Sequence, residues 1–132
     1  MKQTFLIYAI LLLLLPSLYA QNGAPSKARP ASHYVKTGIA SYYGAKFQGR
    51  LMANGQKFDE NKLTAASNTL SLGTWVRVSN LRNRKTVIVQ ITDRMHPKNK
   101  RLIDLSKAAA KKLSFLNRGL AKVRVEVVDS RR

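Results

Sequence analysis

Apolar and polar residues alternate in several short stretches of this chain. Residues 75–78 and 85–91 each place valine or isoleucine at every second position, and residues 81–84 separate them. A period of two predicts β-strands with one buried face, here joined by a turn. The same pattern over 123–127 predicts a last strand, and residues 38–44, bounded by two glycines, predict a first one.

Helical signals are fewer than strand signals. Ser106 is a favourable N-cap, and residues 107–113 combine alanines with lysines toward the carboxyl end, which predicts a helix. A shorter helical turn is expected over residues 60–66. Several short strands with one or two short helices in a chain of 132 residues predict a mainly β fold, a single small closed barrel.

The amino-terminal segment has the composition of a secretory signal. Lys2 precedes an apolar run over 5–15, and Ala20 ends a stretch of small residues, so residues 1–20 are expected to be a signal peptide cleaved before Gln21. The alternative, a membrane anchor, needs roughly 20 apolar residues. We therefore expect a periplasmic or secreted protein with a flexible linker over 21–33, a folded domain over 34–129 and a basic tail over 130–132.

The net charge and the cysteine content limit the kinds of binding partner that this protein can have. The chain has 24 lysines and arginines against 6 acidic residues, a net charge of +18, and no cysteine. An exported cation of this size favours anionic envelope polymers over nucleic acid. The absence of cysteine excludes disulfides and a lipid anchor, and the isolated His33 and His96 do not form a zinc-ligand pattern. No metal or cofactor is predicted, and the protein is expected to be a monomer.

Two of the six carboxylates are candidates for chemistry. Asp93 directly follows an apolar strand and is followed by Arg94, a setting that suits either a salt bridge or a catalytic acid. Asp104 lies two residues before the predicted N-cap Ser106 and could be catalytic or a structural residue at the helix start. The aromatic rings of residues 42, 43, 47 and 75 could stack on sugars, although in a small barrel at least half must belong to the core.

A series of motifs runs in order through the predicted domain. They are ASYYG at 40–44, FQGR at 47–50, ANG at 53–55, LTAA at 63–66, TLSLGT at 69–74, VRVSNL at 76–81, TDR at 92–94 and IDLSKAA at 103–109. In these motifs the chain resembles the rare lipoprotein A family. The resemblance implies a double-psi β-barrel that acts on peptidoglycan glycan strands as an endolytic lytic transglycosylase, with a preference for strands that lack stem peptides.

The resemblance also implies roles for individual residues. Asp93 matches a residue needed for activity in the family, and Asp104 matches the acid of the related expansin and endoglucanase barrels. Tyr43 and Arg94 are the corresponding candidates for substrate contacts. A lytic transglycosylase closes a 1,6-anhydro ring with the sugar's own 6-hydroxyl, so a single well-placed acid can suffice.

The chain departs from the family at two positions. Gln56 stands where the family's enzymes have a glutamate, and Ser67 stands where they have a histidine. Both can hydrogen-bond a sugar, but neither can transfer a proton near neutral pH. We therefore keep two hypotheses: a transglycosylase with weakened activity, and a non-catalytic peptidoglycan-binding or wall-loosening module that uses the same groove.

Overall fold

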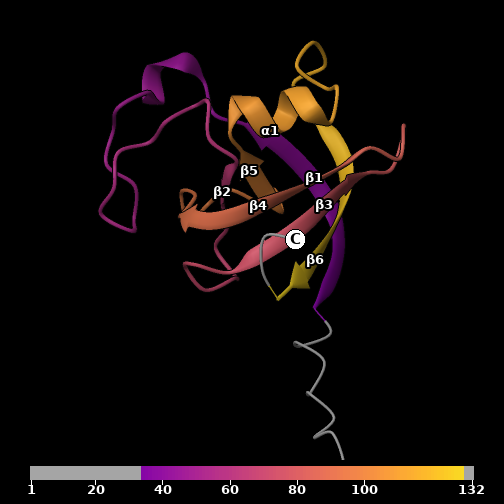
Figure 1. The fold of residues 1–132 in the computed structure, drawn as a ribbon, viewed down its shortest axis with the longest axis horizontal. Coiled ribbons are helices and arrows are strands. Elements are labelled where there is room, and N and C mark those ends of the chain that lie inside the picture. The colour runs from indigo at the N-terminus through magenta and orange to yellow at the C-terminus, as the bar shows by residue number, and fades with distance from the viewer. Residues whose placement is uncertain (1–33, 130–132) are drawn as a thin grey trace, which may run out of the picture. The chain divides into compact units, whose positions relative to one another are not determined.

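The computed structural model describes residues 34–129, where six strands close into one barrel (Figure 1). The predicted signal peptide, linker and basic tail lie outside the described residues. Around the barrel the order is β1 (Val35–Tyr42), β5 (Ile103–Leu105), β2 (Thr64–Ala66), β4 (Thr86–Asp93), β3 (Trp75–Asn80) and β6 (Ala121–Val128). The mainly β prediction is confirmed.

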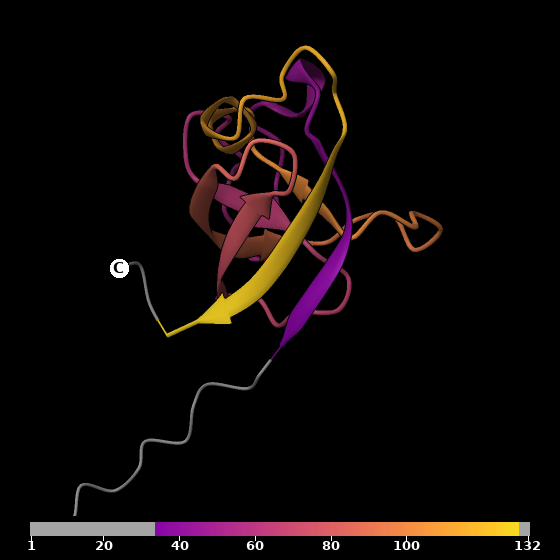
Figure 2. The ribbon, with the colours of Figure 1, turned by 90° about the vertical axis from the view of Figure 1, so that its right-hand side faces the viewer.

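Valines on alternate positions build the barrel interior. Val76 and Val78 of β3 and Val123 and Val125 of β6 are fully or almost fully buried, while the residues between them are partly exposed. This confirms the strands predicted from the period of two. Strand β6 also pairs antiparallel with β1 from Val35 to Ala40, and the two run side by side in Figures 1 and 2.

The predicted helix is present as α1 (Lys107–Lys112), which lies across one end of the barrel (Figure 1). The buried Ser106 hydroxyl accepts a hydrogen bond from the Ala109 amide at 3.2 Å, so the N-cap prediction is confirmed. Ala109 and Ala110 face the core, and the lysines face outward. Within residues 34–129, no helix is long and apolar enough to cross a membrane.

The helical turn predicted over residues 60–66 is wrong. Thr64–Ala66 forms strand β2, in which Ala65 pairs with Leu105 of β5 on one side and Ile91 of β4 on the other. Alanine favours helix in isolation, but hydrogen bonds to two neighbouring strands outweigh that weak preference. The three-residue strand β5 and the 3₁₀ turn Ala45–Phe47 were also not predicted, because such short elements show no period.

Candidate active site

Strand β2 brings the two candidate aspartates into one row. Ala66 of β2 is the register partner of both Asp93 on β4 and Asp104 on β5, and Asp104 is in turn paired with Ser41 on β1. Neighbouring strands lie about 4.8 Å apart, so the two aspartate backbones are at most about 10 Å apart, with Ala66 between them. The small residue leaves room above this part of the barrel wall.

A pocket of about 600 Å³ opens over that row. Both aspartates line it, together with Tyr43 and with residues of two segments that follow β1 and β4. The first segment supplies Phe47 and Phe58, and the second supplies Arg94, Met95, His96, Asn99 and Arg101. Four of the six predicted site residues, Tyr43, Asp93, Arg94 and Asp104, thus lie in the same pocket.

The carboxylate of Asp93 is held by three hydrogen-bond donors. Its Oδ1 accepts from the backbone amides of Ala53 and Arg94, both at 2.8 Å, and its Oδ2 accepts from the Tyr43 hydroxyl at 2.6 Å. The two amides fix one oxygen from the backbone, which turns the other oxygen toward the phenol. Asp93 therefore has a single defined orientation at the end of β4.

Tyr43 is fixed by an aromatic cluster as well as by Asp93. Its ring stacks on Phe58 with centroids 4.2 Å apart and meets Phe47 edge-on at 5.6 Å. Burial of the phenol, followed by its hydrogen bond to Asp93 and the charges of Asp93 and Asp104, raises the pKa of Tyr43 well above its usual value. The phenol consequently remains a donor toward Asp93 across the physiological range.

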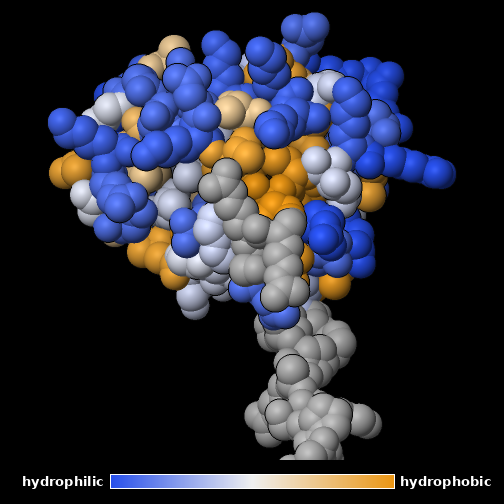
Figure 3. All heavy atoms as spheres, viewed as in Figure 1, coloured by the Kyte–Doolittle hydropathy of each residue, from blue (hydrophilic) through white to orange (hydrophobic). Residues whose placement is uncertain are grey.

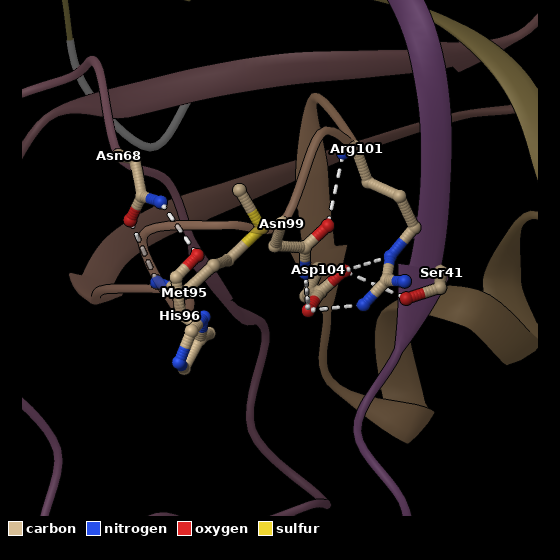
Figure 4. Close-up of polar contacts among 7 residues, drawn as sticks. All are labelled: Ser41, Asn68, Met95, His96, Asn99, Arg101 and Asp104. Atoms are coloured by element: carbon tan, nitrogen blue, oxygen red, sulfur yellow. Dashed lines mark hydrogen bonds and ion pairs between the residues drawn. The ribbon is translucent and has the colours of Figure 1, made fainter.

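Asp104 has a different environment, dominated by a cation (Figure 4). Its Oδ1 accepts from Ser41 at 2.6 Å and from Arg101 Nε at 2.9 Å. Its Oδ2 accepts from Arg101 Nη2 at 3.2 Å and from Asn99 Nδ2 at 3.4 Å. The hydrogen bond to Asp104 raises the pKa of the Arg101 guanidinium, so the guanidinium stays charged. Asp104 thereby ties the segment that leads to β5 to strand β1.

Arg94 and Ser67 are engaged by the protein itself. Arg94 Nη1 donates to the carbonyl oxygens of Ser67 and Leu70 at 2.7 and 2.6 Å. The Ser67 side chain is 1% exposed, and its hydroxyl accepts from the amides of Thr69 and Leu70. Together they fix the loop after β2. Arg94 lines the pocket, but one nitrogen of its guanidinium is already hydrogen-bonded to this loop. Ser67 is buried and does not line the pocket.

Gln56 lies at an exposed turn beside the pocket. The backbone amide of Gln56 donates to Asn54 Oδ1 at 3.0 Å, and its backbone carbonyl accepts from the amide of the buried Met52 at 2.8 Å. The same turn supplies the Ala53 amide that binds Asp93. Gln56 does not line the pocket, although the turn it belongs to positions the carboxylate.

Sequence reasoning did not single out several residues of the pocket, among them Phe58, Asn99 and Arg101. Phe58 forms part of the aromatic wall, and Asn99 and Arg101 contact Asp104. Phe58 could have been noticed as an isolated aromatic residue in a polar stretch of the sequence. Asn99 and Arg101 have no sequence pattern that would have marked them as partners of Asp104. Among residues 34–129, no cluster of three or more histidine, cysteine or acidic side chains could hold a metal ion.

The barrel and its pocket agree with a known family. The family model described as "Lytic transglycolase" matches residues 35–125, so the chain belongs to this family of double-psi β-barrel domains. The expected kinship with rare lipoprotein A is confirmed by relatives with that name. The "Endolytic peptidoglycan transglycosylase RlpA" of Neisseria meningitidis serogroup A is 45% identical over 97 residues, which cover 74% of this chain and 41% of the relative.

A relative with the same name from Pseudomonas aeruginosa is 50% identical over 99 residues, which cover 75% of this chain and 29% of the relative. The one from Haemophilus influenzae is 42% identical over 112 residues, covering 85% of this chain and 39% of the relative. The chain thus spans less than half the length of these relatives.

Solved structures share the fold. A Streptomyces papain inhibitor aligns with a TM-score of 0.59 and 28% identity, over 72% of this chain and 94% of that one. An expansin of Clavibacter michiganensis aligns with a TM-score of 0.58 and 22% identity, over 74% of this chain and 52% of that one. These likenesses support the double-psi β-barrel.

Proposed function

We propose that this protein is an endolytic peptidoglycan lytic transglycosylase with Asp93 as its single general acid and base. The observation that carries the proposal is the position of Asp93, in a pocket beside an aromatic wall, with its carboxyl group held in one orientation by three donors. The family and the names of the relatives support the same reaction.

The environment of Asp93 suggests which oxygen transfers the proton. Oδ1 already accepts two backbone hydrogen bonds, whereas Oδ2 accepts only one, from the Tyr43 hydroxyl, and so keeps a lone pair for a proton. We place the proton on Oδ2. From there it passes to the glycosidic oxygen as the bond breaks, and Oδ2 then takes the proton of the sugar's 6-hydroxyl as the anhydro ring closes. Water takes no part in this sequence.

The other site residues have supporting roles in this proposal. Tyr43 orients Asp93, and Asp104 positions Arg101 and Asn99 rather than exchanging a proton, because four donors surround its carboxylate. Gln56 and Ser67 add no titratable group, so we propose slow turnover, with a preference for strands that lack stem peptides. Export to the periplasm or medium, without a lipid anchor and as a monomer, belongs to the same proposal.

Incubation with denuded glycan strands tests the function. The purified protein should release products that end in 1,6-anhydro-N-acetylmuramic acid, detected by mass spectrometry. Asp93→Asn preserves the shape of the side chain but cannot transfer a proton, so its products should fall at least about a hundredfold. Unchanged products from Asp93→Asn would refute the assignment. Binding without products from the wild type would favour the non-catalytic module instead.

A further inference from the structure

A second hollow adjoins the active-site pocket. It has a volume of about 680 Å³, and it shares His96, Asn99 and Arg101 with the first pocket. The shared residues belong to the segment between β4 and β5, which stands out from the barrel in Figure 2 (orange). A polymer bound in the active-site pocket can therefore continue into this second hollow, which we call the side pocket.

The side pocket is positively charged. Residues 94–101 contain four lysines or arginines and no acidic residue. Arg94 is bound to backbone carbonyls and Arg101 is paired with Asp104. The exposed Lys98 and Lys100 take part in none of the ion pairs found among residues 34–129, which are Arg77–Glu126, Arg101–Asp104 and Arg124–Glu126. Two ammonium groups thus remain available to an incoming anion.

The segment that carries these lysines is held in place at both ends (Figure 4). At its start, Asn68 accepts from the Met95 amide at 2.8 Å and donates to the His96 carbonyl at 3.3 Å. At its end, Asn99 and Arg101 bind Asp104. Lysines on an anchored segment lose less conformational freedom on binding than lysines on a free loop.

The floor of the side pocket is apolar. Ile39 and Leu120 line it and are 41% and 53% exposed. A ligand that suits this surface combines a carboxylate with a small apolar group. The lactyl ether of muramic acid has this combination, a methyl group next to a carboxylate, and its carboxylate is free only where the stem peptide has been removed.

We infer that the side pocket binds the free lactyl carboxylate of a muramic acid residue next to the cleavage point, with Lys98 and Lys100 as its cationic partners. The inference rests on the proposed function, because it assumes a glycan strand in the active-site pocket. It also gives a physical reason for a preference for denuded strands: a stem peptide converts the carboxylate to a neutral amide and occupies the same space.

Binding measurements on paired variants test this inference. Lys98→Gln/Lys100→Gln removes two charges at the side pocket, and Lys111→Gln/Lys112→Gln removes two exposed charges on α1. Both pairs and the wild type are titrated with denuded glycan and with the same glycan after conversion of its carboxylates to methylamides. The first pair should lose about fivefold to tenfold in affinity for the free acid and little for the amide, consistent with two exposed ion pairs.

Three outcomes would overturn the inference. Equal losses for the two pairs would indicate net charge alone, and equal losses on acid and amide would exclude the carboxylate. A larger loss on glycan that still carries stem peptides would assign the lysines to a peptide carboxylate. If the wild type releases anhydro products but the Lys98/Lys100 pair shows no selective loss of affinity for the free acid, the side pocket is rejected and the proposed function is kept. If the affinity loss is selective but no products form, the proposed function is rejected and the side pocket is kept.

Discussion

At the scale of single residues, the two pocket aspartates differ in what surrounds them. Asp93 accepts from two backbone amides and a phenol, and it forms no ion pair within residues 34–129, whereas Asp104 accepts two hydrogen bonds from a guanidinium. The sequence could predict that Asp93 ends a buried strand. It could not predict Tyr43 as its donor, because the two residues lie fifty positions apart and meet only when the barrel closes.

The raised pKa of Tyr43 predicts a loss of stability in alkali. In the unfolded chain this phenol ionises near pH 10, but the folded protein keeps it protonated. The unfolded state therefore releases a proton that the folded state retains, and stability should decrease as pH rises above about 10. Thermal unfolding measured between about pH 8 and about pH 11 should show a smaller fall for Tyr43→Phe than for the wild type. Parallel curves would contradict the burial of this hydroxyl against Asp93.

Replacing Gln56 by glutamate should increase turnover. The turn that contains Gln56 also supplies the Ala53 amide bound to Asp93, so a carboxylate at position 56 would lie three residues along the chain from a group that contacts the proposed acid. Proximity of two carboxyl groups helps to keep one of them protonated near neutral pH. We expect up to about a tenfold rise in anhydro products, which corresponds to about 1.4 kcal/mol of barrier. Asn61→Glu adds the same charge outside the turn that contacts Asp93 and should not raise the rate.

At the scale of elements, strand pairing determines conformations that the local sequence pattern does not predict. The alternating valines of β3, β4 and β6 each report a buried face, so those strands were predictable. Strand β2 consists of Thr64, Ala65 and Ala66, which show no such period. Its conformation comes from β4 and β5, and the same pairing sets Asp93 and Asp104 on either side of Ala66. The sequence therefore allowed the candidate residues of the site to be predicted, but not their arrangement in space.

Strand β1 contains a glycine that cannot be enlarged without cost. A Cβ atom at Gly38 would lie 2.8 Å from Cβ of Leu102, so Gly38→Ala forces the backbones apart. We expect a loss of about 1–3 kcal/mol in the free energy of unfolding, measured by urea denaturation. Gly44→Ala is the control, because Gly44 has a φ of −70° and nothing within 4 Å of an added Cβ. It should leave stability equal or slightly raised, and equal losses at both positions would contradict the close contact.

At the scale of the whole molecule, the net positive charge is expected to dominate the long-range attraction between the protein and anionic polymers. Hydrophilic side chains cover the end of the molecule where α1 lies (Figure 3), and the net charge of the chain is +18. Added salt shortens the screening length from about 30 Å at 0.01 M to about 8 Å at 0.15 M. Retention on isolated sacculi in a sedimentation assay should therefore fall steeply over that range. Salt-independent retention would mean that stacking and neutral hydrogen bonds dominate binding.

The pairing of β1 with β6 also determines when the barrel can close. The first described strand finds a partner in the last, from Val35 opposite Glu126 to Ala40 opposite Ala121, and β6 also pairs with β3. Contacts between segments so distant in sequence form slowly, since the chain must first close a long loop. Until β6 arrives, β1 and β3 each expose an unpaired edge that can recruit another chain. A chain cut before Ala121 would therefore keep both edges open and be prone to aggregate.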